Sequence, residues 1–152
     1  MKRRQEVRFS SDKVILIEDF AHHPTAVSQT IAAVSESYPE RKILAVFEPR
    51  SNTSRRKVFQ QEYERGFSAA DEAILCQPIS SSIDAGQELI DVSELTNNII
   101  DRGTPCSHFE SPEEILSNLS EREFDKHLLL VMSNGAFGGL CQKLEAHLKN
   151  SY

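Results

Sequence analysis

Three stretches of this 152-residue chain combine ligand-binding side chains with proline or glycine residues that shape a turn. They are EDFAHHPTA at 18–26, EPRSNT at 48–53 and SNGAFGG at 133–139. An acid beside two histidines can accept hydrogen bonds or bind a metal ion. An arginine offers a planar pair of donors to a carboxylate or phosphate. Small residues let a ligand approach the backbone.

The first stretch has structural as well as functional interpretations. Asp19 could accept a hydrogen bond from a ligand, or it could cap the following helix. His22 and His23 could line a ligand site, form a polar turn, or hold a metal ion together with further ligands. No motif such as HExxH supports the metal site. The remaining histidines are His108, His127 and His147.

The other two stretches also have two interpretations each. Arg50 follows a proline and precedes Ser51 and Asn52, so it could bind an anion from a rigid turn or simply lie at the surface. SNGAFGG could approach a ligand or only connect a strand to a helix. The sequence contains neither GxxxxGK[ST] nor GxGxxG, so we expect a nucleotide's triphosphate to be bound mainly outside this chain.

Short apolar runs alternate with helical patterns, and together they predict the elements that position these stretches. The runs predict strands at 14–17, 43–47, 73–76 and 128–132, with a weaker candidate at 105–109. Because the runs are continuous rather than alternating, we expect both faces of the sheet to be buried. The alternation predicts an α/β fold: a Rossmann-like, doubly wound, mostly parallel sheet of five or six strands with helices on both faces.

Start signals and apolar repeats predict helices between the strands. Pro24 opens the first helix, and aromatic residues spaced by four predict a second near 57–70. Asp91 and Ser111 each begin a capping box, and a leucine repeat at 140–148 predicts a C-terminal helix. Ligands bind beyond the carboxyl ends of the strands in such sheets. We therefore expect the three polar stretches to converge at one edge.

Composition excludes several classes of partner. The net charge is −6, so we expect no nucleic-acid partner. No apolar run approaches the roughly 20 residues that span a bilayer, and no signal peptide is visible. Cys76, Cys106 and Cys141 are odd in number and widely spaced, which favours free buried thiols. We therefore expect a cytoplasmic protein without a membrane partner.

DFAHHPTA, FEPRSNT and SNGAFGG together resemble the C-terminal domain of the Mur ligases. The resemblance runs from about residue 2 to the C-terminal helix. DFAHHPTA is similar to the alanine-adding members as well, whereas EPRSNT with SNGxFGG narrows the resemblance to members that add a tripeptide. The resemblance implies an ATP-dependent ligase that joins L-Ala-γ-D-Glu-meso-diaminopimelate to UDP-N-acetylmuramate in peptidoglycan recycling. The alternatives are the alanine-adding ligase, a non-catalytic binding module, or a metallohydrolase built on the histidine pair.

The resemblance also implies a domain organisation. Residues 1–11 would be an extended linker from a central ATPase domain that this chain does not include, and 12–152 the substrate-binding domain. The central domain would carry the ligands of Mg²⁺, so we expect no metal ligand and no catalytic residue here. We expect the isolated domain to be inactive, and the full-length protein to be an acid–amino-acid ligase.

The resemblance also implies roles for individual residues at the matching positions. One departure is Ala136, where the family pattern has glycine, so a positive φ there would be strained. The expected ATP-binding residues are Arg4, with Arg3 as its alternative, Asp19, Phe20, His22 and His23. The expected substrate-binding residues are Arg50, Ser51, Asn52, Thr53, Ser133 and Asn134.

Overall fold

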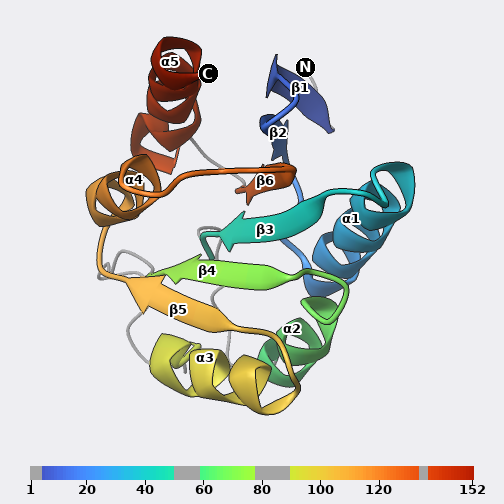
Figure 1. The fold of residues 1–152 in the computed structure, drawn as a ribbon. Coiled ribbons are helices and arrows are strands. Elements are labelled where there is room, and N and C mark those ends of the chain that lie inside the picture. The colour runs from blue at the N-terminus through green and yellow to red at the C-terminus, as the bar shows by residue number, and fades with distance from the viewer. Residues whose placement is uncertain (1–4, 50–58, 78–89, 134–136) are drawn as a thin grey trace.

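The computed structural model describes residues 5–49, 59–77, 90–133 and 137–152. Within these ranges the chain forms one six-stranded sheet and five α-helices (Figure 1). The strands are β1 Glu6–Ser10, β2 Val14–Asp19, β3 Lys42–Phe47, β4 Glu72–Cys76, β5 Cys106–Phe109 and β6 His127–Met132. The helices are α1 Pro24–Ser37, α2 Gln60–Gly66, α3 Val92–Asp101, α4 Pro112–Ser120 and α5 Leu140–Ser151, the last preceded by the 3₁₀ turn η3 Phe137–Gly139.

The sheet has the strand order β1-β2-β6-β3-β4-β5. Strands β2 to β6 are parallel to one another, and β1 pairs with β2 in the antiparallel direction. Helices α1, α2 and α3 cover one face, and α4 and α5 cover the other (Figure 1). The predicted α/β class, with a mostly parallel sheet between two helical layers, is confirmed.

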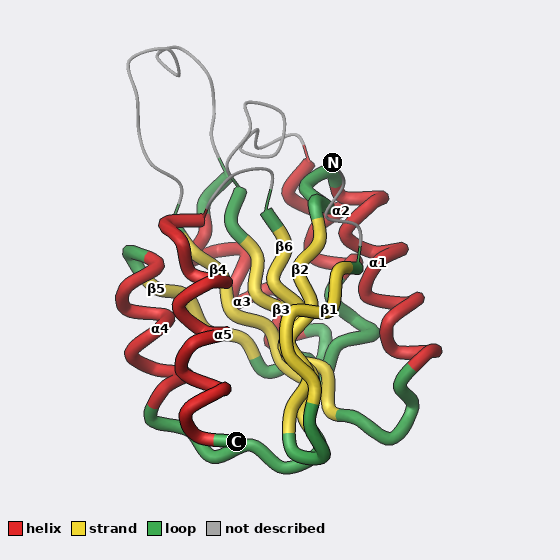
Figure 2. The backbone as a smooth tube through the Cα atoms, turned by 90° about the horizontal axis from the view of Figure 1, so that it is seen from above, coloured by secondary structure: helices red, strands yellow, loops and turns green. Residues whose placement is uncertain are grey.

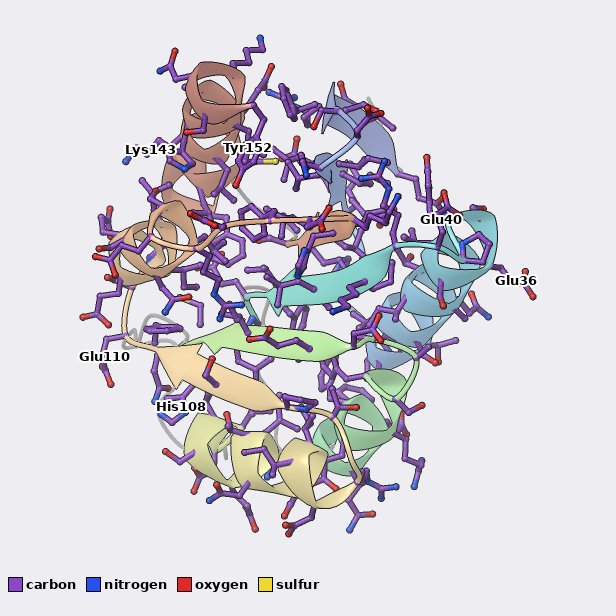
Figure 3. The ribbon with its side chains drawn as sticks, viewed as in Figure 1. Glu36, Glu40, His108, Glu110, Lys143 and Tyr152 are labelled. Carbon is purple, nitrogen blue, oxygen red and sulfur yellow. The ribbon has the colours of Figure 1, made fainter. Side chains whose placement is uncertain are left out.

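Each central strand contributes side chains to both cores, which explains its continuous apolar sequence. In β2, Ile15 and Ile17 pack under α1, while Val14 and Leu16 pack under α4 and α5. Successive side chains of a strand point to opposite faces, so a strand covered on both faces must be apolar at every position. At the rim, charged side chains such as Glu36, Glu110 and Lys143 point outward (Figure 3).

The predicted start signals correspond to the observed helix ends. Asp91 caps α3 by accepting from the amide of Glu94 at 3.1 Å, and Ser111 caps α4 through the amide of Glu114 at 3.3 Å. Pro24 is the first residue of α1, as predicted. These contacts join residues three or fewer positions apart, which is why sequence alone locates them.

The first eleven residues, expected to be an extended lead-in, include the edge strand β1. Its pairing with β2 has a register shift between Val7 and Phe9. The Arg8 guanidinium lies 3.3 Å from a carboxylate oxygen of Glu18 and 3.2 Å from one of Glu145 on α5. This strand is therefore held both to the sheet and to the C-terminal helix.

Candidate functional site

The carboxyl ends of β2, β6 and β3 meet at one edge of the sheet (Figure 2). Beyond the strands, the amide of Ser133 donates to the carbonyl of Asp19 at 3.2 Å. The amide of Glu48 donates to the carbonyl of Met132 at 3.3 Å. These bonds bring the starts of all three polar stretches together, as predicted from the parallel sheet.

Asp19 is a buried carboxylate at this edge, 4% exposed. Its Oδ1 accepts from the amide of Ala21 at 2.7 Å, and its Oδ2 accepts from the amide of Gln5 at 2.8 Å. It does not cap α1, because His23 is the N-cap residue of that helix. A carboxylate has about four acceptor positions, so Asp19 can accept a further hydrogen bond from a ligand.

A pocket of about 540 Å³ opens beside this carboxylate. That volume is within the range of about 300–1,000 Å³ that is usual for small-molecule sites. Phe20 lines the pocket and is 38% exposed, so it offers an aromatic surface next to a hydrogen-bond acceptor. This combination suits a ligand with a flat ring and hydroxyl groups. The pocket is lined by Gln5, Asp19, Phe20, Ala21, His22, Ala26, Gln29, Thr30 and Ala33.

The two histidines have contacts that shape the turn. Nδ1 of His22 lies 3.0 Å from the carbonyl oxygen of Phe20. Nδ1 of His23 accepts from the amide of Thr25 at 3.4 Å, and its ring packs edge-on against Phe59 at 5.1 Å between centroids. In the described ranges, no group of three or more His, Cys, Asp or Glu side chains is arranged to hold a metal ion. These contacts favour the polar-turn interpretation, with His22 also at the pocket wall.

Ser133 and Glu48 form a buried pair between the ends of β6 and β3. The Ser133 hydroxyl donates to Oε1 of Glu48 at 3.1 Å, and Glu48 is only 2% exposed. Sequence reasoning did not select Glu48, although an acid between an apolar run and a proline was a usable signal. The pair holds together the two strand ends that lead into the second and third polar stretches.

Several expected site residues lie outside the described ranges. The structure gives the positions of five expected site residues. Four of them lie between the end of β2 and the start of α1, and the fifth follows β6: Asp19, Phe20, His22, His23 and Ser133. A substrate-binding role for Ser133 stays a prediction. The residues outside the described ranges are Arg3, Arg4, Arg50, Ser51, Asn52, Thr53, Asn134 and Ala136.

The end of the SNGAFGG stretch turns the chain into α5. Phe137, Gly138 and Gly139 all have positive φ, at 52°, 61° and 73°. A Cβ atom at Gly138 would lie 3.0 Å from Cγ of Pro112, so a side chain there would need Pro112, at the start of α4, to move by a few tenths of an ångström. This part of the stretch therefore has a structural role as a tight strand-to-helix connection.

The three cysteines are unsuited to act as nucleophiles. Burial raises the pKa of Cys76, Cys106 and Cys141 to about 12, so their thiols stay protonated and unreactive near neutral pH. All three are free thiols, as expected from their number and spacing. None of the helices in the described ranges combines the length and the apolar character needed to cross a bilayer.

Comparison with known proteins matches this fold and its motifs to one family. A family model described as "Mur ligase, glutamate ligase domain" matches residues 3–135. The UDP-N-acetylmuramate–L-alanine ligase of Desulfitobacterium hafniense is 31% identical over 134 residues, which cover 88% of this chain and 30% of that protein. The UDP-N-acetylmuramate–L-alanyl-γ-D-glutamyl-meso-2,6-diaminoheptandioate ligase of Escherichia coli is 31% identical over 154 residues, covering 94% and 29%.

Solved structures of related ligases share this fold. A murein peptide ligase from Psychrobacter arcticus has a TM-score of 0.79 and 27% identity, covering 98% of this chain and 30% of that one. A MurF ligase from Thermotoga maritima, solved in complex with ADP, shares the fold at a TM-score of 0.63 and 16% identity, covering 100% and 32%. This chain thus spans less than a third of these longer proteins.

The match covers most of the chain, including the first two polar stretches and the start of the third. The chain belongs to the Mur ligase family of ATP-dependent amide ligases in cell-wall biosynthesis, as its C-terminal, glutamate ligase domain.

Proposed function

We propose that this chain is the C-terminal domain of a cytoplasmic ligase that joins L-Ala-γ-D-Glu-meso-diaminopimelate to UDP-N-acetylmuramate in peptidoglycan recycling. In this proposal the domain binds the incoming tripeptide and closes over ATP. The observation that carries the proposal is the convergence of three strand ends. The Asp19 pocket lies at the end of β2, and hydrogen bonds connect this strand end to the end of β6 and that of β6 to the end of β3. Strands β3 and β6 lead into the second and third polar stretches.

The pocket supports the proposed role in binding ATP. The Asp19 carboxylate can accept a hydrogen bond from a ribose hydroxyl, and Phe20 can pack against a flat base. His22 lines the same pocket, and His23 holds the turn that starts α1. Arg4 completes the proposed set, because a guanidinium suits the phosphates.

The chain's contribution to the proposed reaction is orientation. Phosphoryl transfer from ATP activates the carboxylate of UDP-N-acetylmuramate, and the tripeptide amine then displaces phosphate to form the amide. We assign the Mg²⁺ ligands to a central ATPase domain of the full-length enzyme. Correct positioning of reactants contributes about 7–11 kcal/mol to lowering a barrier, so a domain without a nucleophile can still be essential.

The proposed peptide-binding residues belong to the second and third polar stretches. Arg50 can hold a carboxylate of the tripeptide through two parallel hydrogen bonds. Ser51, Asn52, Thr53, Ser133 and Asn134 supply shorter polar side chains. The buried Glu48–Ser133 pair supports this assignment, because it keeps the strand ends before both stretches together.

An alanine-adding ligase is the second candidate. The relative that adds L-alanine and the relative that adds the tripeptide are both 31% identical to this chain. The two candidates share the activated sugar and ATP, and they differ in the amine substrate.

An amine-substrate comparison tests the proposal. Phosphate release by the intact ligase should require UDP-N-acetylmuramate, ATP and Mg²⁺, and it should be much faster with the tripeptide than with L-alanine. The opposite preference would establish the second candidate. Release with neither amine would reject both.

A lysine substitution tests the proposed role of Arg50. Arg50→Lys keeps the charge but loses the planar pair of donors, so the KM for the tripeptide should rise while those for ATP and UDP-N-acetylmuramate stay nearly unchanged. Removing the peptide carboxylate should then weaken binding to the wild type more than to the variant. Equal losses in the two proteins would show that Arg50 does not contact that carboxylate.

A further inference from the structure

Tyr63 contacts two parts of the candidate site from the core side. It lies on α2, is fully buried, and its hydroxyl donates a hydrogen bond to the carbonyl oxygen of His22. Its ring lies 5.2 Å from the ring of Phe47, the last residue of β3, with an interplanar angle of 38°. One side chain therefore contacts both the turn after β2 and the end of β3.

The hydrogen bond to His22 fixes the backbone of the turn. The turn carries Asp19, Phe20 and His22, which all line the pocket. Burial, followed by the charge of Glu62, raises the pKa of Tyr63, so its hydroxyl remains a donor throughout the physiological pH range. Without that donor, the His22 carbonyl would lose a hydrogen-bond partner that holds the turn.

Two further features link the turn after β2 to α2 and to the end of β3. Phe59, just before α2, packs against the ring of His23, so the start of α2 contacts this turn at a second point. On the other side, Phe47 directly precedes Glu48, which accepts the hydrogen bond from Ser133. A continuous set of contacts thus runs from the pocket turn through Tyr63 to the buried pair.

We propose that Tyr63 is a positioning residue: its hydroxyl holds the nucleotide turn, while its ring holds the strand end that leads to the peptide-binding stretch. This inference rests on the proposed function, because it takes the pocket as the ATP site. Tyr63 contacts neither substrate itself. It keeps the turn after β2 and the end of β3 in one relative geometry, so that the phosphates and the incoming amine meet at the right distance.

Tyr63→Phe separates the two contacts, because it removes the hydroxyl and retains the ring that packs on Phe47. In the intact ligase the KM for ATP should rise about threefold to tenfold, the value of one lost hydrogen bond. The KM for the tripeptide should change by less than about twofold. Tyr38→Phe is the matched control, because Tyr38 packs against the same core at the far end of α1 and should leave both constants unchanged.

Hydrogen exchange on this chain provides a readout that does not depend on activity. In Tyr63→Phe, two amides should exchange about threefold to tenfold faster: that of Ala21, which bonds to Asp19 within the turn, and that of Val27, which bonds to the His23 carbonyl at the start of α1. The amides of Leu129 and Leu130 in β6 should exchange at the wild-type rate. Uniformly faster exchange would show general destabilisation and overturn the inference.

The KM values also distinguish the positioning role from general damage. An unchanged KM for ATP, or an equal rise for ATP and tripeptide, would overturn the positioning role. If the wild-type ligase shows no ATP-dependent amide formation, the proposed function fails. The exchange comparison would then still decide whether Tyr63 holds the turn.

Discussion

Asp19 shows at the scale of single residues how a proposed ligand contact can also stabilise the fold. Its two oxygens already accept hydrogen bonds from the amides of Ala21 and Gln5. The sequence suggested a choice between binding a ligand and capping α1. In the structure Asp19 does not cap α1. Its side chain instead links the start of β1 to the turn after β2.

Asp19→Ala should therefore affect both stability and ATP use. Leaving the buried amide of Ala21 without an acceptor should lower the free energy of unfolding by about 1–3 kcal/mol. A lost hydrogen bond from ribose to a charged group should raise the apparent ATP constant about tenfold in the intact ligase, measured well below the melting temperature.

Asp91→Ala is the control for this effect. Asp91 also accepts a backbone hydrogen bond, at the start of α3, and it does not line the pocket. Its loss should cost about 0.5–2 kcal/mol of stability with no change in the ATP constant. If Asp19→Ala behaves in the same way, Asp19 is a purely structural residue.

At the scale of elements, the connection from β6 to α5 depends on two glycines that meet different surroundings. Gly138 and Gly139 both have positive φ. A Cβ at Gly138 would lie 3.0 Å from Pro112, whereas among the described residues one at Gly139 would approach Lys143 alone, at 3.9 Å. Both positions thus require a left-handed backbone, and Gly138 also requires space next to Pro112. Alanine substitutions at the two glycines separate these requirements.

Gly139→Ala should cost about 1–2 kcal/mol of stability, the value of a left-handed conformation in a residue with a Cβ. Gly138→Ala should cost more, because α4 must also shift away from the new methyl group. Urea unfolding of the two variants measures the difference. Equal losses would mean that α4 moves freely and that only the backbone conformation matters.

At the scale of the whole molecule, the chain holds one edge of a larger proposed site. It belongs to a family of ATP-dependent ligases, yet spans less than a third of the length of the relatives compared. It has neither of the common phosphate-binding motifs in its sequence. The pocket and the tied strand ends therefore suit a domain that binds and orients substrates for a second domain.

The 152-residue chain alone should catalyse no ligation. Mixed with ATP, Mg²⁺, UDP-N-acetylmuramate and tripeptide, it should release phosphate at the background rate. The reading frame that encodes it should continue upstream into a domain with a P-loop, and the protein made from that frame should be active. Turnover by the 152 residues alone would contradict the proposed division of labour.

Much of the fold could be predicted because its signals are local. Strands β2, β3, β4 and β6 follow from continuous apolar runs, and the caps Asp91 and Ser111 act on amides three residues away. The polar stretches after the strands were predicted to converge because parallel strands end at a common edge. The strand β1 was not predicted, because its short, largely polar sequence becomes a strand only by pairing with β2.

The sequence by itself determined the central strands, the helix starts, the α/β class and the motifs that identify the family. The tertiary structure alone decided which side chains share the site. Ser133 and Glu48 are 85 positions apart, and Tyr63 and His22 are 41 apart. Contacts at such separations depend on which strands become neighbours and on how a helix packs over them. That outcome depends on all the residues that fill the core, and no local spacing records it.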